Sequence, residues 1–148
     1  IVLVVVVVLI LVGTYFLLRK NGVLNKVLGV NEGFEGGGEL NNLQNKPNPK
    51  ENEVILILFY VDWCPHCVSS KPEFAKVVQQ MNNQNVNGKN VKVQACNCEG
   101  SEVEQQVAKD NNIQGYPTIK LIKNSEVLDY NGNRNANDMM EFVKSNCQ

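Results

Sequence analysis

The chain has 148 residues, enough for one domain with additional segments, and its 14 basic and 15 acidic residues leave a net charge of −1. No cluster of lysines and arginines marks a nucleic-acid-binding surface, so we expect no nucleic-acid partner. The cysteine count of five is odd, which argues against a small secreted domain in which every cysteine is paired.

Residues 1–20 predict a single transmembrane anchor. Residues 1–18 are apolar apart from the interruption at 13–15, and as a helix they would span roughly 27 Å, close to the hydrocarbon thickness of a bilayer. Arg19 and Lys20 follow at once, as expected at a headgroup boundary. A signal-peptide core and a buried helix are the alternatives, but no small-residue cleavage site follows, and a buried helix is rarely so rich in valine.

We therefore expect a lipid bilayer as a partner and a single-pass membrane location. The side of the membrane stays open between an oxidising lumen or periplasm and the internal membrane of a virus particle. Residues 21–53 predict a linker, because the glycine run at 36–38 cannot hold a regular element and residues 46–49 favour extended chain.

From residue 54 to the end of the chain, strands and helices are predicted to alternate. The order is β-α-β-α-β-β-α, with strands at 54–61, 91–96, 117–123 and 126–130, helices at 65–83, 101–111 and 136–146, a polar turn at 85–90 and a tight turn at 124–125. Ser101 and Glu104 have the spacing of a capping box. The pattern predicts an α/β domain with a central mixed sheet and a right-handed parallel crossover.

The motif Cys64-Pro65-His66-Cys67 lies where the first predicted strand gives way to a helix. Two cysteines at this spacing can close a small disulfide ring, and the unpaired N–H groups of a helix N-terminus favour the thiolate form of the first sulfur. The motif therefore points to redox chemistry. His66, between the two cysteines, is more consistent with an electrostatic role than with a metal ligand or a core residue.

Further motifs surround this one in a fixed order. They are Phe59-Tyr60 and Trp63 before the cysteine pair, Pro72-Glu73-Phe74 after it, Lys92-Val93-x-Ala95 in the next strand, Gly115-Tyr116-Pro117-Thr118, and Tyr130, Gly132 and Arg134 before the last helix. With these motifs the chain from residue 54 onward resembles the thioredoxin superfamily, and most of all the catalytic domain of a protein disulfide isomerase. The resemblance implies a thioredoxin-like fold.

The resemblance also implies catalytic roles. Cys64 would be the exposed nucleophile, Cys67 the resolving thiol, and His66 a group that stabilises the Cys64 thiolate. Pro117 would be a cis-proline that faces the disulfide. No cofactor is implied beyond the redox-active Cys64–Cys67 disulfide itself, and no metal.

Three residues would contact the substrate, which the resemblance implies to be the thiols and disulfides of other proteins. Trp63 would shield the cysteine pair, and Tyr116 would present backbone groups to an extended substrate strand. Pro65 with His66 forms the dipeptide of the bacterial periplasmic disulfide oxidases, which implies an oxidising poise and favours an oxidase or isomerase over a reductase.

Two positions depart from the family pattern. Leu58 stands where these domains carry a buried acid that assists proton transfer at the second cysteine. Lys92, which matches the family's lysine, then lacks its partner, and we expect it to reach solvent or another acid such as Asp62. In addition, the strand and helix that usually precede the central strand are missing, so either the fold is trimmed or irregular chain replaces that layer.

Cys96 and Cys98 should lie at the active-site edge of the sheet, because parallel strands share their C-terminal edge. They are interpreted as small loop residues, as an electron relay to Cys64 and Cys67, or as zinc ligands together with that pair. Cys147 is expected to be free or a crosslink point.

The main hypothesis is a membrane-anchored thiol–disulfide oxidoreductase. The alternative, of a different class, is a structural or docking thioredoxin-like membrane protein with weak or no turnover in a large assembly such as a virion, where neighbouring proteins would hold the tether. It is motivated by Leu58 and by the glycine-rich and asparagine-rich tether. A metal-binding module is the third hypothesis.

Overall fold

The computed structural model describes residues 39–124 and 126–148. The expected anchor at 1–20 and the first part of the expected linker, 21–38, lie outside these residues. Among the helices of the two described ranges, none is long and apolar enough to cross a bilayer.

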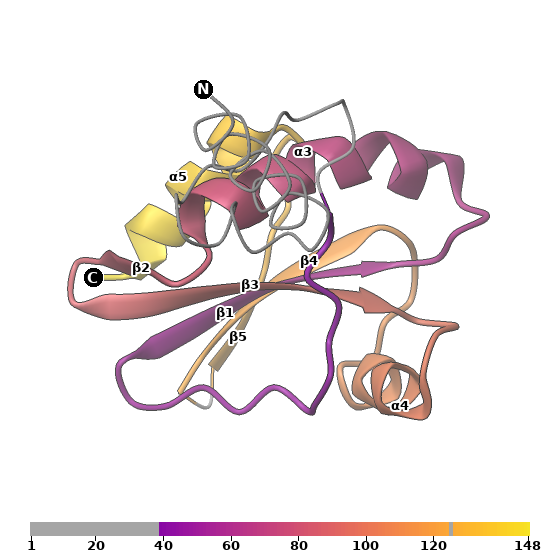
Figure 1. The fold of residues 1–148 in the computed structure, drawn as a ribbon, viewed down its shortest axis with the longest axis horizontal. Helices are drawn as coiled ribbons and strands as arrows, with labels where there is room; N and C mark the ends of the chain where they lie inside the picture. Colours follow the sequence, from indigo (N-terminus) through magenta and orange to yellow (C-terminus); the bar gives the residue numbers. More distant parts are fainter. Residues whose placement is uncertain (1–38, 125) are drawn as a thin grey trace, which may run out of the picture. The chain divides into compact units, whose positions relative to one another are not determined.

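A mixed sheet of five strands forms the centre of the described residues, in the order β2-β3-β1-β4-β5 (Figure 1). The strands are β1 (Glu53–Tyr60), β2 (Gln84–Val86), β3 (Lys89–Asn97), β4 (Thr118–Lys123) and β5 (Glu126–Asp129). β1 pairs with β3 in parallel and with β4 antiparallel, and the outer strands pair antiparallel with their neighbours. The predicted α/β class, central mixed sheet and parallel crossover are therefore confirmed.

Helices cover both faces of this sheet. α3 (Pro65–Met81) and α5 (Ala136–Asn146) lie on one face, and α4 (Glu102–Asp110) lies on the other (Figure 1). β1 is apolar on both sides because it is sandwiched between these layers: Leu56 and Leu58 pack into the core with α3 and α5, whereas Ile57 and Phe59 pack into the core with α4. The alternation of the strand thus divides one apolar run between two cores.

One element differs from the prediction. The segment at 85–90, expected to be a polar turn, is instead a hairpin in which the short strand β2 pairs with the start of β3. Its two turn residues, Asn87 and Gly88, have positive φ angles of 50° and 84°, the combination that a two-residue type I′ turn requires. β2 was missed because its residues are polar and carry no apolar alternation.

The prediction that the linker extends as far as residue 53 also differs from the structure. Leu43 is only 2% exposed, and the segment before β1 lies along β3. The Leu43 N–H donates to the Ala95 carbonyl at 2.8 Å, and the Ala95 N–H donates to the Asn41 carbonyl at 2.8 Å. Residues 41–43 thus belong to the folded domain. Burial of a leucine side chain such as Leu43 stabilises a fold by roughly 1.5–3 kcal/mol. Irregular chain, rather than a trimmed edge, accompanies this side of the sheet.

The capping box at the start of α4 is confirmed. The Ser101 hydroxyl accepts from the Glu104 N–H at 3.4 Å, and the Glu104 carboxylate accepts from the Ser101 N–H at 3.0 Å. The same buried carboxylate accepts from the Asn97 N–H at 2.9 Å, at the end of β3. Glu104 therefore fixes the β3–α4 connection, which contains Cys98, as well as the helix end.

Candidate active site

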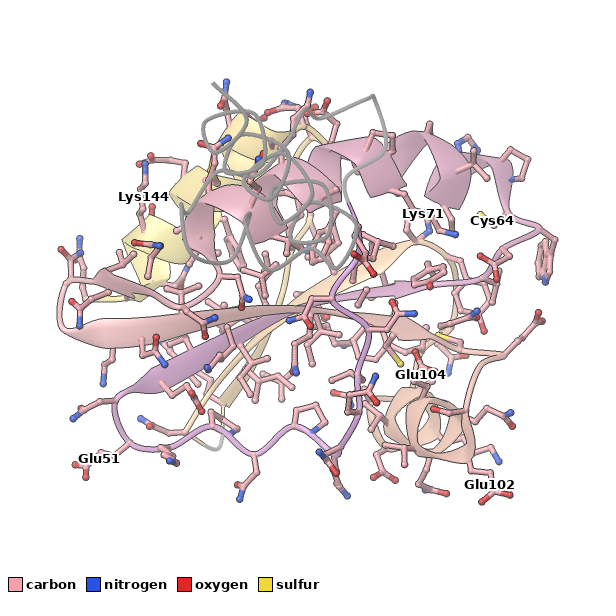
Figure 2. The ribbon with its side chains drawn as sticks, in the orientation of Figure 1. Glu51, Cys64, Lys71, Glu102, Glu104 and Lys144 are labelled. Atoms are coloured by element: carbon pink, nitrogen blue, oxygen red, sulfur yellow. The ribbon has the colours of Figure 1, made fainter. Side chains whose placement is uncertain are left out.

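Cys64 is the N-cap residue of α3, which begins at Pro65, four residues after the chain leaves the sheet at Val61. Its sulfur accepts a hydrogen bond from the Cys67 N–H at 3.4 Å (Figure 2 shows Cys64 at the start of the helix). The N–H groups of the first helical turn are not used within the helix, and the helix dipole adds positive charge at this end. The local sequence therefore places the first thiol where a thiolate is stabilised.

The two thiols of the motif differ in ionisation. A hydrogen bond from the Cys67 thiol, the N–H groups of Cys67 and His66 and the charge of Arg134 lower the pKa of Cys64, against burial, which raises it. Burial, followed by the hydrogen bond to Cys64, raises the pKa of Cys67 to about 11. Both thiols are free, and the pair combines a sulfur that ionises readily with one that holds its proton.

Access to the pair is narrower than the resemblance implied. Cys64 was expected to be exposed, but it is only 6% exposed, and Cys67 is fully buried. The Cys64 thiol donates to the Tyr116 carbonyl at 3.7 Å, so the loop before β4 lies against the sulfur. The Tyr116–Pro117 peptide bond is cis, as the resemblance implied. Any sulfur atom that reacted with Cys64 would therefore have to approach beside Tyr116.

The rim of the site is aromatic. Trp63 is 67% exposed, and its ring meets the ring of Tyr116 edge to face at a centroid distance of 6.3 Å. The Trp63 indole N–H donates to both carboxylate oxygens of Glu99, at 3.0 and 3.1 Å. Pro65 and His66 are exposed beside it. Glu99 was missed by the sequence analysis, and no local pattern could have found it, because the contact joins two loops.

A groove of about 400 Å³ adjoins the cis-proline loop. Gly115, Pro117 and Thr118 line one side, and Gly132 and Arg134, from the connection between β5 and α5, line the other. The motifs that precede β4 and α5 in the sequence therefore meet in space. A groove next to an open sheet edge of this kind can accept a peptide in extended form.

Position 58, where the resemblance implied a buried acid, is occupied by leucine. Leu58 is fully buried in the core that contains Cys67. Lys92 does not reach Asp62. Its amine donates to the Asn83 side-chain oxygen at 2.6 Å in an exposed position, which is the solvent alternative.

Asp62 has a different partner, Lys71, four residues after Cys67 on α3 (labelled in Figure 2). The Lys71 amine lies 2.6 Å from the Asp62 carboxylate and 4.1 Å from the centre of the Tyr60 ring. Its charge acts on the Cys67 thiol and lowers that pKa, although burial outweighs it. The spacing of four residues from Cys67 was the available signal in the sequence.

The remaining cysteines are separate from this pair. Cys96 is fully buried, Cys98 is half-buried at the end of β3, and Cys147 is fully buried at the end of α5, so a crosslink through Cys147 would need the helix end to open. Within residues 39–124 and 126–148, no group of three or more metal-binding side chains lies close enough to hold an ion. The four cysteines are therefore not gathered into one cluster in these ranges.

Comparison with known proteins agrees with this geometry. A family model described as Thioredoxin matches residues 41–145. The chain is 36% identical over 93 residues to a protein disulfide-isomerase of Drosophila melanogaster, across 63% of this chain and 18% of that protein. It is 35% identical over 92 residues to a probable protein disulfide-isomerase A4 of Caenorhabditis elegans, across 62% of this chain and 14% of that protein.

The first thioredoxin domain of mouse Protein disulfide-isomerase A4 has a similar solved structure, with a TM-score of 0.58 and 23% identity, covering 80% of this chain and 89% of that one. Human ERp44 matches with a TM-score of 0.56 and 22% identity, covering 66% of this chain and 29% of that one. At these identities the likeness shows the fold alone.

The chain spans less than a fifth of the length of the two curated relatives, so the similarity concerns one domain of each. The residues of this chain that match the family model include the strand-to-helix junction with Cys64 and Cys67 and the cis-proline loop described above. The family model covers more than half of the chain, from the segment along β3 to the end of α5. The chain belongs to the thioredoxin family.

Proposed function

We propose that the chain is a thiol–disulfide oxidoreductase that acts on the cysteines of other proteins through Cys64-Pro65-His66-Cys67. The observation that carries this proposal is the unequal pair at the N-terminus of α3, where the pKa of Cys64 is lowered and the pKa of Cys67 is raised. Thiol–disulfide exchange proceeds through attack by a thiolate. The Cys64 sulfur is thus suited to nucleophilic attack, whereas the Cys67 sulfur stays protonated until the mixed disulfide has formed.

In the reducing direction, the Cys64 thiolate attacks one sulfur of a substrate disulfide, forms a mixed disulfide and releases the other substrate sulfur as a thiolate. Cys67 then loses its proton and attacks the Cys64 sulfur, which closes the Cys64–Cys67 disulfide and releases the substrate. In the oxidising direction the same steps run backwards, with a substrate thiolate attacking Cys64. Two electrons and two protons are exchanged in either case.

We expect the second step to be the slow one in this chain. In the reduced pair, where its pKa is about 11, Cys67 is ionised in roughly one molecule in ten thousand at pH 7, and its burial persists in the mixed disulfide. Leu58 offers no carboxylate to take the proton, and Lys71 is the charged side chain of α3 that acts on this thiol. We therefore expect a long-lived mixed disulfide with substrates.

Substrate would bind in extended form along the cis-proline loop. The Tyr116 backbone lies against the Cys64 sulfur, and Trp63 provides an exposed aromatic surface on the same rim. Because main-chain groups recognise any sequence, binding of this kind selects for accessible cysteines more than for particular neighbours.

The test is the reduction potential of the Cys64–Cys67 pair in the full chain, measured in glutathione buffers, together with the rate of exchange with a peptide that carries two cysteines. Cys64→Ser should reduce that rate to the uncatalysed value. The matched control is Cys147→Ala, which removes a buried thiol at the far end of α5 and should leave the rate unchanged. An unchanged rate in Cys64→Ser would overturn the proposal, and a pair that never cycles with glutathione would favour a structural docking domain.

We also propose that the enzyme works next to a membrane, on the oxidising side. Support comes from the apolar run at 1–18, which Arg19 and Lys20 follow, and from Pro65-His66, which suits a compartment that favours disulfides. The full chain should float with lipid vesicles after an alkaline wash. A variant with Val6→Asp and Leu9→Asp should stay in the soluble fraction, and flotation of that variant to the same extent would contradict membrane insertion.

A further inference from the structure

Cys96 and Cys98 are close enough to bond to each other. Cys96 lies in β3 and Cys98 is the first residue after that strand. Two residues of extended chain span roughly 6.6 Å, which is within the Cα–Cα range of a disulfide. The Cys98 thiol donates to the Cys96 carbonyl at 3.8 Å, and the Cys96 thiol is the main group that lowers the pKa of Cys98. Both are free thiols.

These two cysteines repeat the asymmetry of the first pair. Cys96 is fully buried, and its thiol donates to the Glu104 carbonyl of α4 at 3.3 Å. Cys98 is half-buried where β3 ends, and its N–H donates to the Tyr60 carbonyl at 2.8 Å. The Cys98 thiol is thus the more exposed of the two and the Cys96 thiol the more buried, just as Cys64 is more exposed than Cys67.

The position of Cys98 connects it with the substrate rim. The hydroxyl of Tyr116 is among the groups that lower the pKa of Cys98, and the carbonyl of the same tyrosine accepts from the Cys64 thiol at 3.7 Å. The next residue, Glu99, holds Trp63. Figure 2 shows Glu104, against which Cys96 packs, at the same edge of the sheet as Cys64. A disulfide that reaches Tyr116 along the rim therefore comes close to Cys98 as well.

We propose that Cys96 and Cys98 form a second dithiol–disulfide couple at the edge of the active site. The Cys98 thiolate attacks one sulfur of a disulfide, either oxidised glutathione or a protein disulfide, and releases the first thiol. Cys96 then gives up its proton and attacks the Cys98 sulfur, which closes the Cys96–Cys98 bond and releases the second thiol. The reagent gains two electrons and two protons, and the chain loses them.

The consequence is a doubled redox capacity. A chain with both couples exchanges four electrons instead of two, and the second couple does not require Cys64 or Cys67. The inference is thus independent of the proposed function, and each can fail without the other.

The test uses the full chain with Cys64→Ser and Cys67→Ser, equilibrated in glutathione buffers from reducing to oxidising. The remaining thiols are alkylated under denaturing conditions and counted by mass. We expect Cys96 and Cys98 to become protected together, in a single two-electron transition, while Cys147 remains open to alkylation. Adding Cys96→Ser should convert this product into a glutathione adduct on Cys98, because no resolving thiol is left.

Two results would overturn the inference. The first is full alkylation of both cysteines in every buffer, and the second is a glutathione adduct on Cys98 while Cys96 is present. Peptide mapping of the unmodified chain gives the same answer if the double variant does not fold, since the fragment with Cys96 and Cys98 should then lose two hydrogens in oxidising buffer. Exchange through Cys64, measured with Cys96→Ser and Cys98→Ser, reports on the proposed function alone.

Discussion

At the scale of single residues, Leu58 decides how the second thiol of the motif behaves. It is fully buried in the same core as Cys67, at the position where the family resemblance implied a buried acid. A leucine stabilises that core by apolar contact but cannot accept a proton. The chain therefore combines a firm core with a Cys67 thiol that ionises only at high pH.

Leu58→Glu should shorten the lifetime of the mixed disulfide between Cys64 and glutathione at pH 7, because the carboxylate can take the Cys67 proton. The same change should lower the free energy of unfolding by about 3–5 kcal/mol, since an unpaired charge is buried. Quenching the reaction with acid and separating the species by mass measures the lifetime, and urea unfolding measures the stability.

Ile57→Glu is the matched control. Ile57 is equally buried on β1, but it faces the core that contains α4 rather than the one that contains Cys67. It should lose comparable stability without a shorter lifetime. Equal shortening in both variants would mean that loosening of the domain, not proton transfer, speeds the reaction.

At the scale of elements, periodicity predicts those parts of the fold that bury a continuous apolar face. β1 is an unbroken apolar run, and the α4 start has its capping box, so both follow from local sequence. β2 and the segment around Leu43 do not, because each consists mostly of polar residues whose position is decided by backbone pairing with β3. A segment that is held on the sheet mainly by backbone hydrogen bonds need not have a periodic pattern of apolar residues.

Leu43→Ala tests whether the segment before β1 contributes to the stability of the domain. Removing a buried leucine side chain should cost about 2–5 kcal/mol, because the cavity between this segment and the core with α4 cannot fill completely. Val127→Ala, at an exposed position on β5, is the control and should change stability by about 0.5 kcal/mol or less. A loss in Leu43→Ala no larger than the control would mean that the segment is not held on the domain in solution.

At the scale of the whole molecule, the candidate site collects residues from distant parts of the chain. The cysteine motif and the cis-proline loop were found by their own sequence signals, and the fold brings them together at Tyr116. Glu99 carries no such signal, and the spacing of Lys71 from Cys67 does not reveal its partner, since the contacts of these residues with Trp63 and Asp62 exist only once loops and helix are in place. Motif residues are thus predictable from sequence, whereas the charged groups that adjust them are determined by tertiary structure.

Three buried thiols, Cys67, Cys96 and Cys147, give the reduced protein a common pH dependence. Burial raises the pKa of Cys67 and Cys147, and the Cys98 thiol together with burial raises that of Cys96. In the unfolded chain each thiol ionises near pH 8.5. Between that value and the folded pKa the folded state binds more protons, so the free energy of unfolding falls as the pH rises.

Cys64 and Cys98, whose pKa values are lowered, have the opposite effect, which fades above about pH 8.5 because their thiols are then ionised in the unfolded chain as well. The expected outcome is that reduced protein loses stability from about pH 8.5 to 9.5, a range below the ordinary ionisation of tyrosine and lysine. Urea unfolding at intervals of half a pH unit, with a reductant present, measures the slope. Cys147→Ala removes one of the three groups and should make the slope shallower without reversing it. Oxidation of the Cys64–Cys67 pair removes Cys67 in the same way, so oxidised protein should also show a shallower slope than reduced protein. A slope that is zero or positive in the reduced protein would contradict the burial of these thiols in the folded state.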